Sequence, residues 1–324
     1  MSIRLVFAMA TKTILPDAAP ALLLDVGGTF IKCSDGREVP IDSAGSREEI
    51  VGALREAVGD AERVAVAIPG PFDYHNGVFL MKHKFAAVYG ERFAELVAPP
   101  DAPDAPSGHA LSGRKMAGQS TDPRLHHADA HPVISSEGEA GVEKSFVFVH
   151  DVNAMLLGAL QDPELAQYRR IALVTLGTGL GFAVSIDGKF QTNENGSPNI
   201  PLYNRPYLDG IAEDYASKRG VMHAWSEVTG RVWPEEQTVK GIVGTPEGEA
   251  AFALMGERLA EAVAPLLAEL GIECLLFGGQ ISRSFALFAP SLRSGLAKVP
   301  TLRHIGPISD IGNATFNGLK SLLH

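Results

Sequence analysis

The first residues that could do chemistry follow a short apolar run, Leu22–Leu24, which has the character of a buried strand. Asp25 comes at the end of this run, and Gly27-Gly28-Thr29 then turn the chain. Paired glycines permit positive φ and let bare backbone N–H groups point into one concavity, which suits an anion. A carboxylate beside that concavity would repel a bare phosphate, so Asp25 makes chemical sense if a divalent cation, Mg²⁺, stands between the two. For this segment alone, an ordinary hairpin turn is the alternative.

A second segment of the chain repeats this design. LLLDVGGTFIKCSDGR begins at Leu22 and LVTLGTGLGFAVSIDGK begins at Leu173, so the copies start 151 residues apart in a chain of 324. Each copy runs from an apolar strand through a glycine-rich turn into a second strand and ends at an Asp-Gly hairpin signal. Two like halves with a glycine hairpin each predict two domains that hold a polyphosphate between them. The residues after Gly181 continue as strand, so the helix-opening phosphate motifs do not fit.

A third candidate is Asp151, which follows His150 at the end of an apolar strand predicted over 146–149. A helix is expected over 153–160, so Asp151 fits the N-cap of that helix. It equally fits a general base, because α/β folds place their chemistry at strand ends that face a cleft. One side chain can serve both roles.

The elements that position these residues follow from apolar periodicity and capping signals. Further strands are expected at 64–68 and 272–277, and the first of these ends at Pro69-Gly70-Pro71, where prolines forbid further ladder donors. Helices are expected from Ser46 through Val58, over 153–160, over 209–219, from Thr245 to Gly271, from about Ser282, and over 310–323. Because Gly278-Gly279 precede a helix, a base or ribose is expected to lie against their backbone.

Composition limits the partners. With 45% hydrophobic and 20% charged residues over 324 positions, the chain is expected to form a two-domain soluble enzyme. The formal net charge of −10, without a basic block, argues against nucleic acid and membrane partners. Only Cys33 and Cys274 are present, so the cytoplasm is the expected compartment. Secretion is the lesser alternative, because the apolar stretch Ile3–Ala10 is short for a signal peptide, and no stretch is long enough to span a membrane.

Composition also suggests the domain boundaries. Residues 1–20 are expected to be a flexible lead-in, and 98–144 a polar, partly mobile insertion that could act as a lid. The N-terminal domain is expected at 21–149 and the C-terminal domain at 150–309, with a helix at 310–324 joining the first domain. A metal site in the insertion would need rigidly held ligands. The candidate ligands there are His109, His126, His127, His131, Asp122 and Asp129.

In this order, the motifs resemble the ROK family of sugar kinases, which has the actin/hexokinase/Hsp70-like fold. The matching segments, spread over nearly all of 22–324 except the insertion, are Asp25–Thr29, Pro69-Gly70-Pro71, Asp151–Ala154, Gly177–Gly181 and Gly278-Gly279. The resemblance implies an α/β protein of two actin-like (ribonuclease H-like) domains, whose mixed sheets flank a nucleotide and sugar cleft. It also implies a homodimer.

The resemblance implies a role for each matched residue. Asp151 would be the catalytic base, and Asp25 would hold Mg²⁺, through water. ATP and its phosphates would contact Asp25, Gly27, Gly28, Thr29, Lys32, Gly177, Thr178, Gly179, Gly278 and Gly279. The sugar would contact Gly70, His150, Asp151, Asn153 and Glu213.

The sequence departs from the family pattern in three places. The usual Asn-Asp pair is His150-Asp151, which puts part of the sugar contact in doubt. The usual Glu-x-Gly-His sugar and metal segment should fall near Asn195–Pro201, yet NGSPNIP has neither Glu nor His. The Cys-rich zinc motif is absent, so structural zinc is not expected. The lead-in is too short for the helix-turn-helix of the family's repressors.

These features predict ATP-dependent phosphorylation of a hexose-type hydroxyl, with Asp151 as general base and Mg-ATP as phosphoryl donor. A non-catalytic sugar-binding sensor of the same fold is the alternative from another class, since the Glu-x-Gly-His segment is missing. A third interpretation is an ATPase of this fold that acts on a non-sugar acceptor.

Overall fold

A computed structural model describes residues 20–98 and 144–323. The predicted flexible lead-in at 1–20 and the insertion at 98–144, with its histidines, fall almost entirely outside the described residues. None of the described helices combines the length and the apolar character needed to cross a membrane.

The first half of the chain forms a mixed sheet with the strand order β3-β2-β1-β4-β7. Its strands are β1 (Leu22–Val26), β2 (Phe30–Cys33), β3 (Glu38–Pro40), β4 (Arg63–Ile68) and β7 (Ser145–His150). β1, β2 and β3 are joined antiparallel, whereas β1, β4 and β7 run parallel. A small hairpin, β5 (Phe72–Asp73) with β6 (Val78–Phe79), and a short helix α2 (Phe93–Leu96) follow β4.

The second half repeats this topology, in the order β10-β9-β8-β13-β14. Its strands are β8 (Arg170–Leu176), β9 (Leu180–Ile186), β10 (Lys189–Phe190), β13 (Cys274–Gly278) and β14 (His304–Pro307). Again the first three are joined antiparallel, and β8, β13 and β14 run parallel. The sequence repeat therefore corresponds to a repeated sheet, in which β8-β9 occupies the place of β1-β2.

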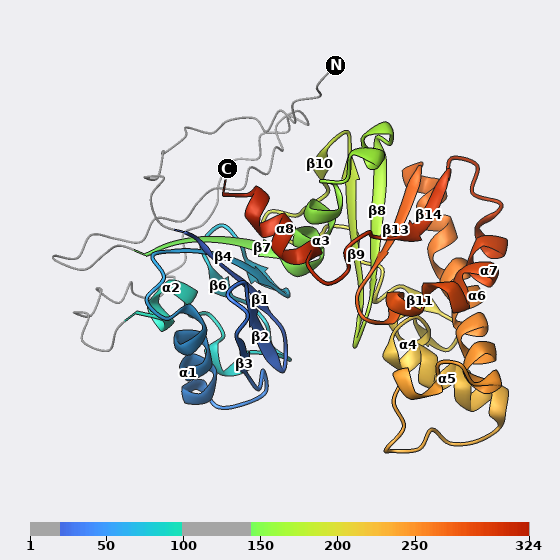
Figure 1. The fold of residues 1–324 in the computed structure, drawn as a ribbon, viewed down its shortest axis with the longest axis horizontal. Helices are drawn as coiled ribbons and strands as arrows, with labels where there is room; N and C mark the ends of the chain where they lie inside the picture. The colour runs from blue at the N-terminus through green and yellow to red at the C-terminus, as the bar shows by residue number, and fades with distance from the viewer. Residues whose placement is uncertain (1–19, 99–143, 324) are drawn as a thin grey trace, which may run out of the picture.

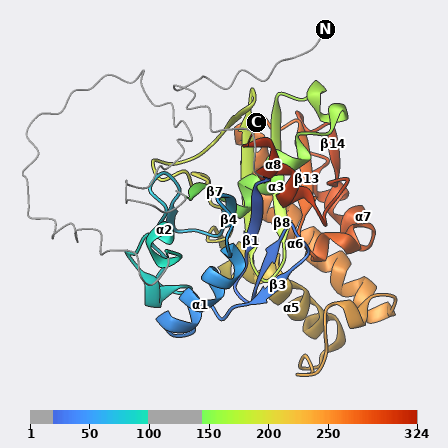
Figure 2. The same cartoon turned by 60° about the vertical axis from the view of Figure 1, so that its left-hand side comes forward.

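Helices and sheets alternate in layers (Figure 1). α1 (Arg47–Val58) covers the outer face of the first sheet, as Figure 2 shows, and α6 (Pro246–Leu270) with α7 (Phe285–Leu296) covers the outer face of the second. α3 (Asp151–Ala159) and α8 (Ala314–Ser321) lie between the sheets. Both faces of the central strands are thus covered, which explains why they read as continuous apolar runs.

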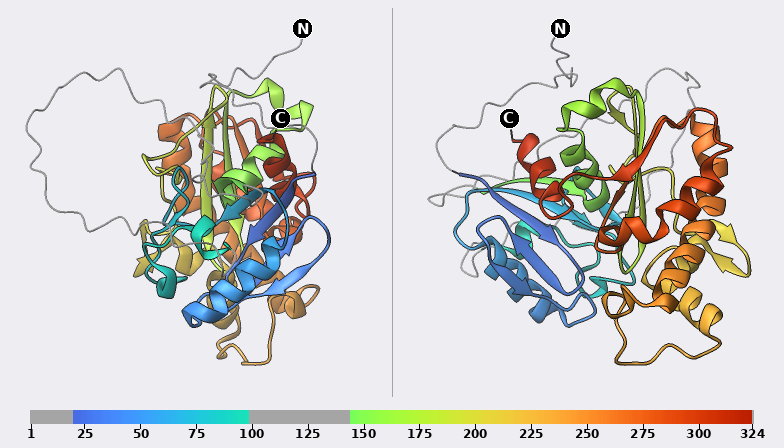
Figure 3. Two further views of the ribbon diagram at one scale, coloured as in Figure 1. Left: turned by 90° about the vertical axis from the view of Figure 1, so that its left-hand side faces the viewer. Right: turned by 45° about the vertical axis from the view of Figure 1, so that its right-hand side comes forward.

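α3 and α8 cross at two glycines. A Cβ on Gly158 would clash with the carbonyl oxygen of Ala314, and a Cβ on Gly318 would clash with the carbonyl oxygen of Ala154. Each helix therefore carries an alanine followed four residues later by a glycine, and each glycine contacts the alanine of the other helix. α8 also packs on the inner face of the first sheet (Figure 3). There Leu319 joins Leu23 and alanines of β4 in one apolar cluster.

Three helix predictions differ from the structure. The helix expected over 209–219 is two helices, α4 (Ala212–Tyr215) and α5 (Lys218–Thr229), because Ala216 leaves the helical conformation and Ser217 caps α5. The helix expected from about Ser282 begins at Phe285, after a 3₁₀ turn, η4 (Ile281–Ser284). The closing helix begins at Ala314, since Asp310 instead accepts hydrogen bonds from the backbone and side chain of Asn313.

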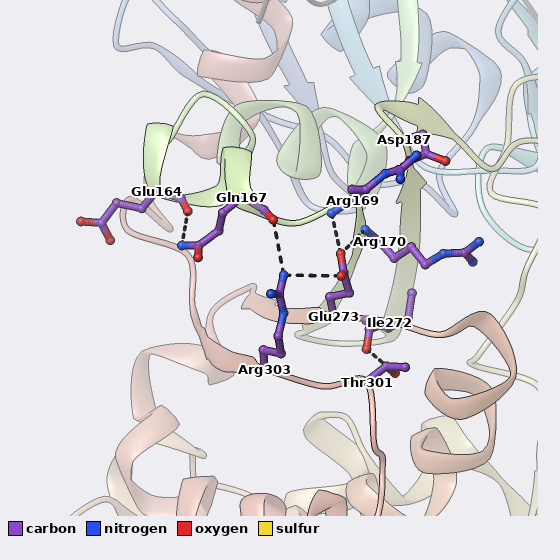
Figure 4. A network of polar contacts seen from close by, with 9 residues as sticks. All are labelled: Glu164, Gln167, Arg169, Arg170, Asp187, Ile272, Glu273, Thr301 and Arg303. Atoms are coloured by element: carbon purple, nitrogen blue, oxygen red, sulfur yellow. Dashed lines mark hydrogen bonds and ion pairs between the residues drawn. The ribbon is translucent and has the colours of Figure 1, made fainter. Parts of the chain in front are cut away.

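Glu273, which directly precedes β13, links the amino-terminal ends of three strands of the second sheet, β8, β13 and β14 (Figure 4). Its carboxylate accepts the backbone N–H of Arg169 at 2.6 Å and that of Arg170 at 3.2 Å, and its other oxygen lies 3.4 Å from the guanidinium of Arg303. The Arg169 N–H bond first, then the Arg170 N–H bond and the charges of Arg303 and Arg169, lower the pKa of this carboxyl. One side chain thereby joins the starts of β8, β13 and β14.

Candidate functional site

Asp151 is the first residue of α3 and directly follows β7, so it lies at the carboxyl end of that strand. The N-cap of α3 is His150, so the prediction that Asp151 caps the helix is wrong by one residue. Asp151 Oδ1 accepts the Val152 N–H at 2.7 Å and lies 2.8 Å from His150 Nδ1. His150 Nδ1 also lies 3.3 Å from the Val152 nitrogen. One nitrogen cannot donate and accept at once, and the two shorter contacts make Oδ1 the acceptor of both N–H groups.

The surroundings keep Asp151 ionised. Burial acts to raise the pKa of its carboxyl, but the charge and hydrogen bond of His150, the Val152 N–H and the charge of Lys84 outweigh it, and the pKa is lowered. Within the described residues, no group donates a hydrogen bond to Oδ2. This oxygen remains available to accept a hydrogen bond from a substrate.

Asp25 lies at the end of β1 and pairs with Lys32 across the first hairpin. Burial first, and then the charge of Asp151, raise the pKa of its carboxyl to about 6, against the opposing charge of Lys32. A partly buried carboxylate that faces a second carboxylate has the chemistry of a cation ligand. Asp25 thus fits a divalent cation, although no group of three or more His, Cys, Asp or Glu side chains within 20–98 and 144–323 is placed to share a metal ion.

The first glycine loop needs its glycines for close approach. Neither Gly27 nor Gly28 has positive φ, contrary to the reason inferred from sequence. A Cβ on Gly27 would lie 2.9 Å from the Phe30 carbonyl oxygen, and one on Gly28 would lie 3.3 Å from Ser43 Oγ. Ser43 is bonded through its backbone to Gly28 and to Phe85, which ties the segment carrying Lys84 to this loop.

The second glycine loop abuts the start of α3. A Cβ on Gly181 would lie 2.6 Å from a methyl group of Val152, the residue after Asp151. The loop is closed by a hydrogen bond from Gly177 N–H to the Gly179 carbonyl, and Thr178 at its tip is exposed. The charge of Asp151 thus acts on Asp25 of the first hairpin, and the residue after Asp151 contacts Gly181 of the second.

Glu213, in α4, packs against the second glycine loop. Its Oε2 accepts the Leu180 N–H at 2.9 Å, and its Oε1 lies 2.7 Å from the guanidinium of Arg219. A Cβ on Gly179 would lie 2.8 Å from Oε2. Both carboxylate oxygens are thus engaged in shaping the loop, and the structure does not bring Glu213 into contact with the other residues predicted to bind sugar.

The remaining predicted sugar residues do converge. A Cβ on Gly70 would lie 3.3 Å from each of three groups: His150 Cδ2, Ser197 Oγ and the Tyr74 hydroxyl. Tyr74 donates to the Ile68 carbonyl at 2.9 Å, and Ser197 acts on its hydroxyl from nearby. Burial first, and then the charge of Asp151, raise the pKa of Tyr74 well above its ordinary value, so its hydroxyl keeps its proton.

The loop that lacks the expected Glu and His lies against this group. Tyr74 N–H donates to the Asn195 carbonyl at 3.0 Å, and Asn153 Nδ2 lies 3.5 Å from the Gly196 carbonyl. The segment 195–199 thus lies against Tyr74 and Asn153, and it brings Ser197 there instead of charged side chains.

Gly278-Gly279 lie beside the second glycine loop. Gly279 has φ +82, and a Cβ there would clash with the backbone of Leu176, the last residue of β8. A cavity of about 520 Å³ opens nearby, beyond η4. It is lined by Ser282, Arg283, Phe285, Ala286, Pro307, Ile308, Ser309, Asp310, Ile311 and Gly312. It offers polar groups and one aromatic ring to a ligand.

Sequence reasoning missed three residues of the site: Tyr74, Lys84 and Ser197. Tyr74 and Ser197 belong to segments far apart in the chain, and only folding brings them together. Lys84 lies in the short polar stretch Lys82-His83-Lys84, where it resembles any exposed lysine. A charged side chain next to the buried Phe85 was the one available signal.

Part of the chain is similar in sequence to a known protein family. The sequence profile of the ROK family matches residues 124–199, a range that includes Asp151 and the second glycine hairpin. None of the curated protein sequences compared with the chain matches it.

Solved structures resemble the whole chain. A ROK family glucokinase from Streptomyces griseus, in complex with glucose and AMPPNP, aligns over 93% of this chain and 98% of its own, with a TM-score of 0.63 at 18% identity. A putative N-acetylmannosamine kinase from Listeria monocytogenes aligns over 94% and 98%, with a TM-score of 0.66 at 14% identity. A ROK family transcriptional regulator, a homolog of the E. coli MLC protein, aligns over 94% and 80%, with a TM-score of 0.60 at 13% identity.

At such identities the likeness to solved structures shows the fold alone. The fold is the mixed α/β architecture of the ROK and actin-like sugar kinases, and the predicted fold class is confirmed. The profile match and this fold together confirm the resemblance to the ROK family that the sequence motifs indicate.

Proposed function

We propose that this protein is an ATP-dependent kinase of a hexose-type sugar. The proposal is supported by the effect of the Asp151 charge on Asp25 of the first hairpin and by the contact of its neighbour Val152 with Gly181 of the second. One carboxylate oxygen of Asp151 is held by two N–H donors, and the other is available. A sugar hydroxyl is a weak nucleophile at neutral pH, and its phosphorylation needs a base that orients it in line with the donor phosphate.

In this proposal each part of the site has one task. The acceptor sugar lies against Gly70, His150 and Asn153, and its reacting hydroxyl donates to Asp151 Oδ2. Because the pKa of Asp151 is lowered, it orients the hydroxyl first and takes the proton late, when the oxygen–phosphorus bond has formed. The products are the sugar phosphate and ADP, and the proton leaves Asp151 to solvent.

The nucleotide is placed by the other loops. The phosphates lie between the hairpin loops 27–29 and 177–179, where Lys32 offsets their charge, and the adenosine lies at Gly278-Gly279 in the adjoining cavity. Asp25 would hold Mg²⁺, which when bound neutralises charge on the donor phosphates. The division into domains at 21–149 and 150–309, joined by the C-terminal helix, and their closure around the substrates belong to the same proposal.

A sugar-binding sensor is the second candidate. The segment 195–199 supplies neither the Glu nor the His of the family pattern, and a transcriptional regulator is among the proteins of similar structure. Asp151 and both glycine loops, which a sensor would not need, favour the kinase.

The deciding experiment is ADP release from Mg-ATP over a panel of hexoses, hexosamines and N-acylhexosamines, with Asp151→Asn as the matched control. Sugar-stimulated release by the wild type that is absent from the variant supports the kinase. Sugar binding in calorimetry with no release from any member of the panel supports the sensor. ATP turnover that no sugar stimulates would instead point to a non-sugar acceptor.

A further inference from the structure

His150 is held tightly beside Asp151. It ends β7 and caps α3, and its side chain is only 16% exposed. The Tyr74 ring packs at a tilt on the imidazole, with centroids 5.8 Å apart, and Gly70 lies against the Cδ2 edge. Its ring therefore has little freedom to turn, and Nδ1 stays directed at Asp151.

The contact with Asp151 uses one carboxylate oxygen only. His150 Nδ1 lies 2.8 Å from Oδ1, and the Val152 N–H lies 2.7 Å from the same atom. A carboxylate with two donors on one oxygen loses its freedom to rotate, so Oδ2 points in a fixed direction. Precise placement matters for a base, because a displacement of about 1 Å can cost on the order of 100-fold in rate.

We propose that His150 is a positioning residue, whose Nδ1–H holds Oδ1 of Asp151 so that Oδ2 alone meets the acceptor hydroxyl. This inference rests on the proposed kinase function and deepens it, because the sequence assigned His150 to sugar contact alone. The Tyr74 ring and Gly70 are parts of the same support, since they fix the plane of the imidazole.

The choice of variants follows from side-chain geometry. The amide nitrogen of asparagine occupies nearly the place of imidazole Nδ1, whereas that of glutamine reaches to the place of Nε2. His150→Asn should therefore keep the donor to Oδ1, and His150→Gln should misplace it. His150→Leu removes the donor and retains most of the volume packed on Tyr74.

The test is steady-state kinetics of these variants, each first shown to be folded by its thermal transition. We expect kcat to fall about 100-fold in His150→Leu and His150→Gln and less than about 5-fold in His150→Asn, with KM for ATP unchanged in all. Equal loss in His150→Asn and His150→Leu would overturn the inference, as would a normal kcat in His150→Leu. Absence of turnover in the wild type would overturn the proposed function itself.

A spectroscopic readout does not depend on turnover. In ¹⁵N-labelled protein, His150 should show a protonated Nδ1 with a downfield proton, and the downfield shift should be lost in Asp151→Leu. An unprotonated Nδ1 in the wild type would overturn the inference, even if the enzyme is active.

Discussion

The two halves of the molecule share a scaffold and differ in chemistry. Pairing across each hairpin puts Asp25 opposite Lys32 in the first half and Thr175 opposite Gly181 in the second. β7 leads into His150-Asp151, whereas β14 ends in Pro307 and leads into the loop that lines the cavity. The carboxylates of the candidate reaction centre therefore come from the first half and the start of α3, whereas the second half supplies the backbone of its glycine loop and the Ser197 side chain.

This difference shows what a repeated fold conserves. Strand order, hairpin and the crossing helix recur because each sheet must bury both faces. A carboxylate at the end of β1 is not required for that burial, and it carries a cost: its raised pKa means that the folded protein disfavours its charge. Such a cost points to function.

The strongest test of the chemical difference between the two halves is to replace the proposed general base, Asp151. Asp151→Asn should lower kcat by 1,000-fold or more on the order-of-magnitude scale of general base catalysis, because an amide cannot take the proton. Asp187→Asn changes an exposed carboxylate of the second half, in the turn between β9 and β10, and should leave kcat within about 3-fold. Coupled ADP-release assays measure both. Similar kcat losses in the two variants would contradict the asymmetry.

The close crossing of α3 and α8 can be tested by replacing its two glycines, Gly158 and Gly318. Gly158→Ala and Gly318→Ala should each destabilise the fold by about 3 kcal/mol or more, because the new methyl group clashes with a helix carbonyl in the facing helix. Gly52, within α1, has open space at its Cβ position. Gly52→Ala is the matched control and should be neutral or stabilising by up to about 1 kcal/mol. Urea unfolding gives the three values.

Asp25 offers a test with a predicted sign. The pKa of Asp25 is higher in the folded protein than in the unfolded chain, so the unfolded chain releases this proton at lower pH. Asp25 therefore has no effect on the free energy of unfolding below about pH 4, and it lowers that free energy as pH rises toward 6. A rise from 3.8 to about 6 corresponds to at most about 3 kcal/mol, and partial exposure reduces it. Without Mg²⁺ at pH 7, Asp25→Asn should therefore be more stable than the wild type by about 1–2 kcal/mol.

The same variant should lose the response to metal. Mg²⁺ with nucleotide should raise the melting temperature of the wild type more than that of Asp25→Asn, and only the wild type should turn over. A variant less stable than the wild type at pH 7, in chelator, would show that Asp25 is a structural residue.

The smallest expected effect concerns the amino ends of the second sheet. Glu273→Gln should cost about 1–2 kcal/mol at pH 7, because the charged acceptor of two backbone N–H groups is lost. Its folded pKa is lowered, so its contribution is present above the unfolded pKa and is lost as pH falls through the folded pKa. Glu62, just before β4, is exposed, and Glu62→Gln should be neutral. If urea unfolding gave the same loss of stability for Glu273→Gln and Glu62→Gln, the proposed role of the Glu273 carboxylate would be wrong.

Local signals in the sequence predicted much of this fold. The capping box of Ser46 with Glu49 and the limits of α6 at Thr245 and Gly271 are found as predicted, because each rests on neighbours in the chain. The buried strands were predictable from their apolar runs, since both faces are covered. The predicted glycine hairpins are present, although the close contacts of Gly27 and Gly28 could not be foreseen.

What the sequence could not show depends on partners from distant segments. Gly158 attracts no notice in its own helix, because its requirement comes from Ala314 in α8. Ser197 meets Tyr74 only through tertiary packing, and Glu213 is drawn to the second loop by the Leu180 N–H and Arg219. The break between α4 and α5 has the same origin, since Lys218 N–H bonds the Gly177 carbonyl.

The return of α8 to the first sheet has a consequence for biosynthesis. Leu319 completes an apolar cluster with Leu23 and the alanines of β4, which leave the ribosome long before it. The inner face of the sheet made first therefore stays without this cover until residues 314–321 have been translated. Until α8 has been made, the inner face of the first sheet is an exposed apolar surface, and chaperones can bind it during that interval.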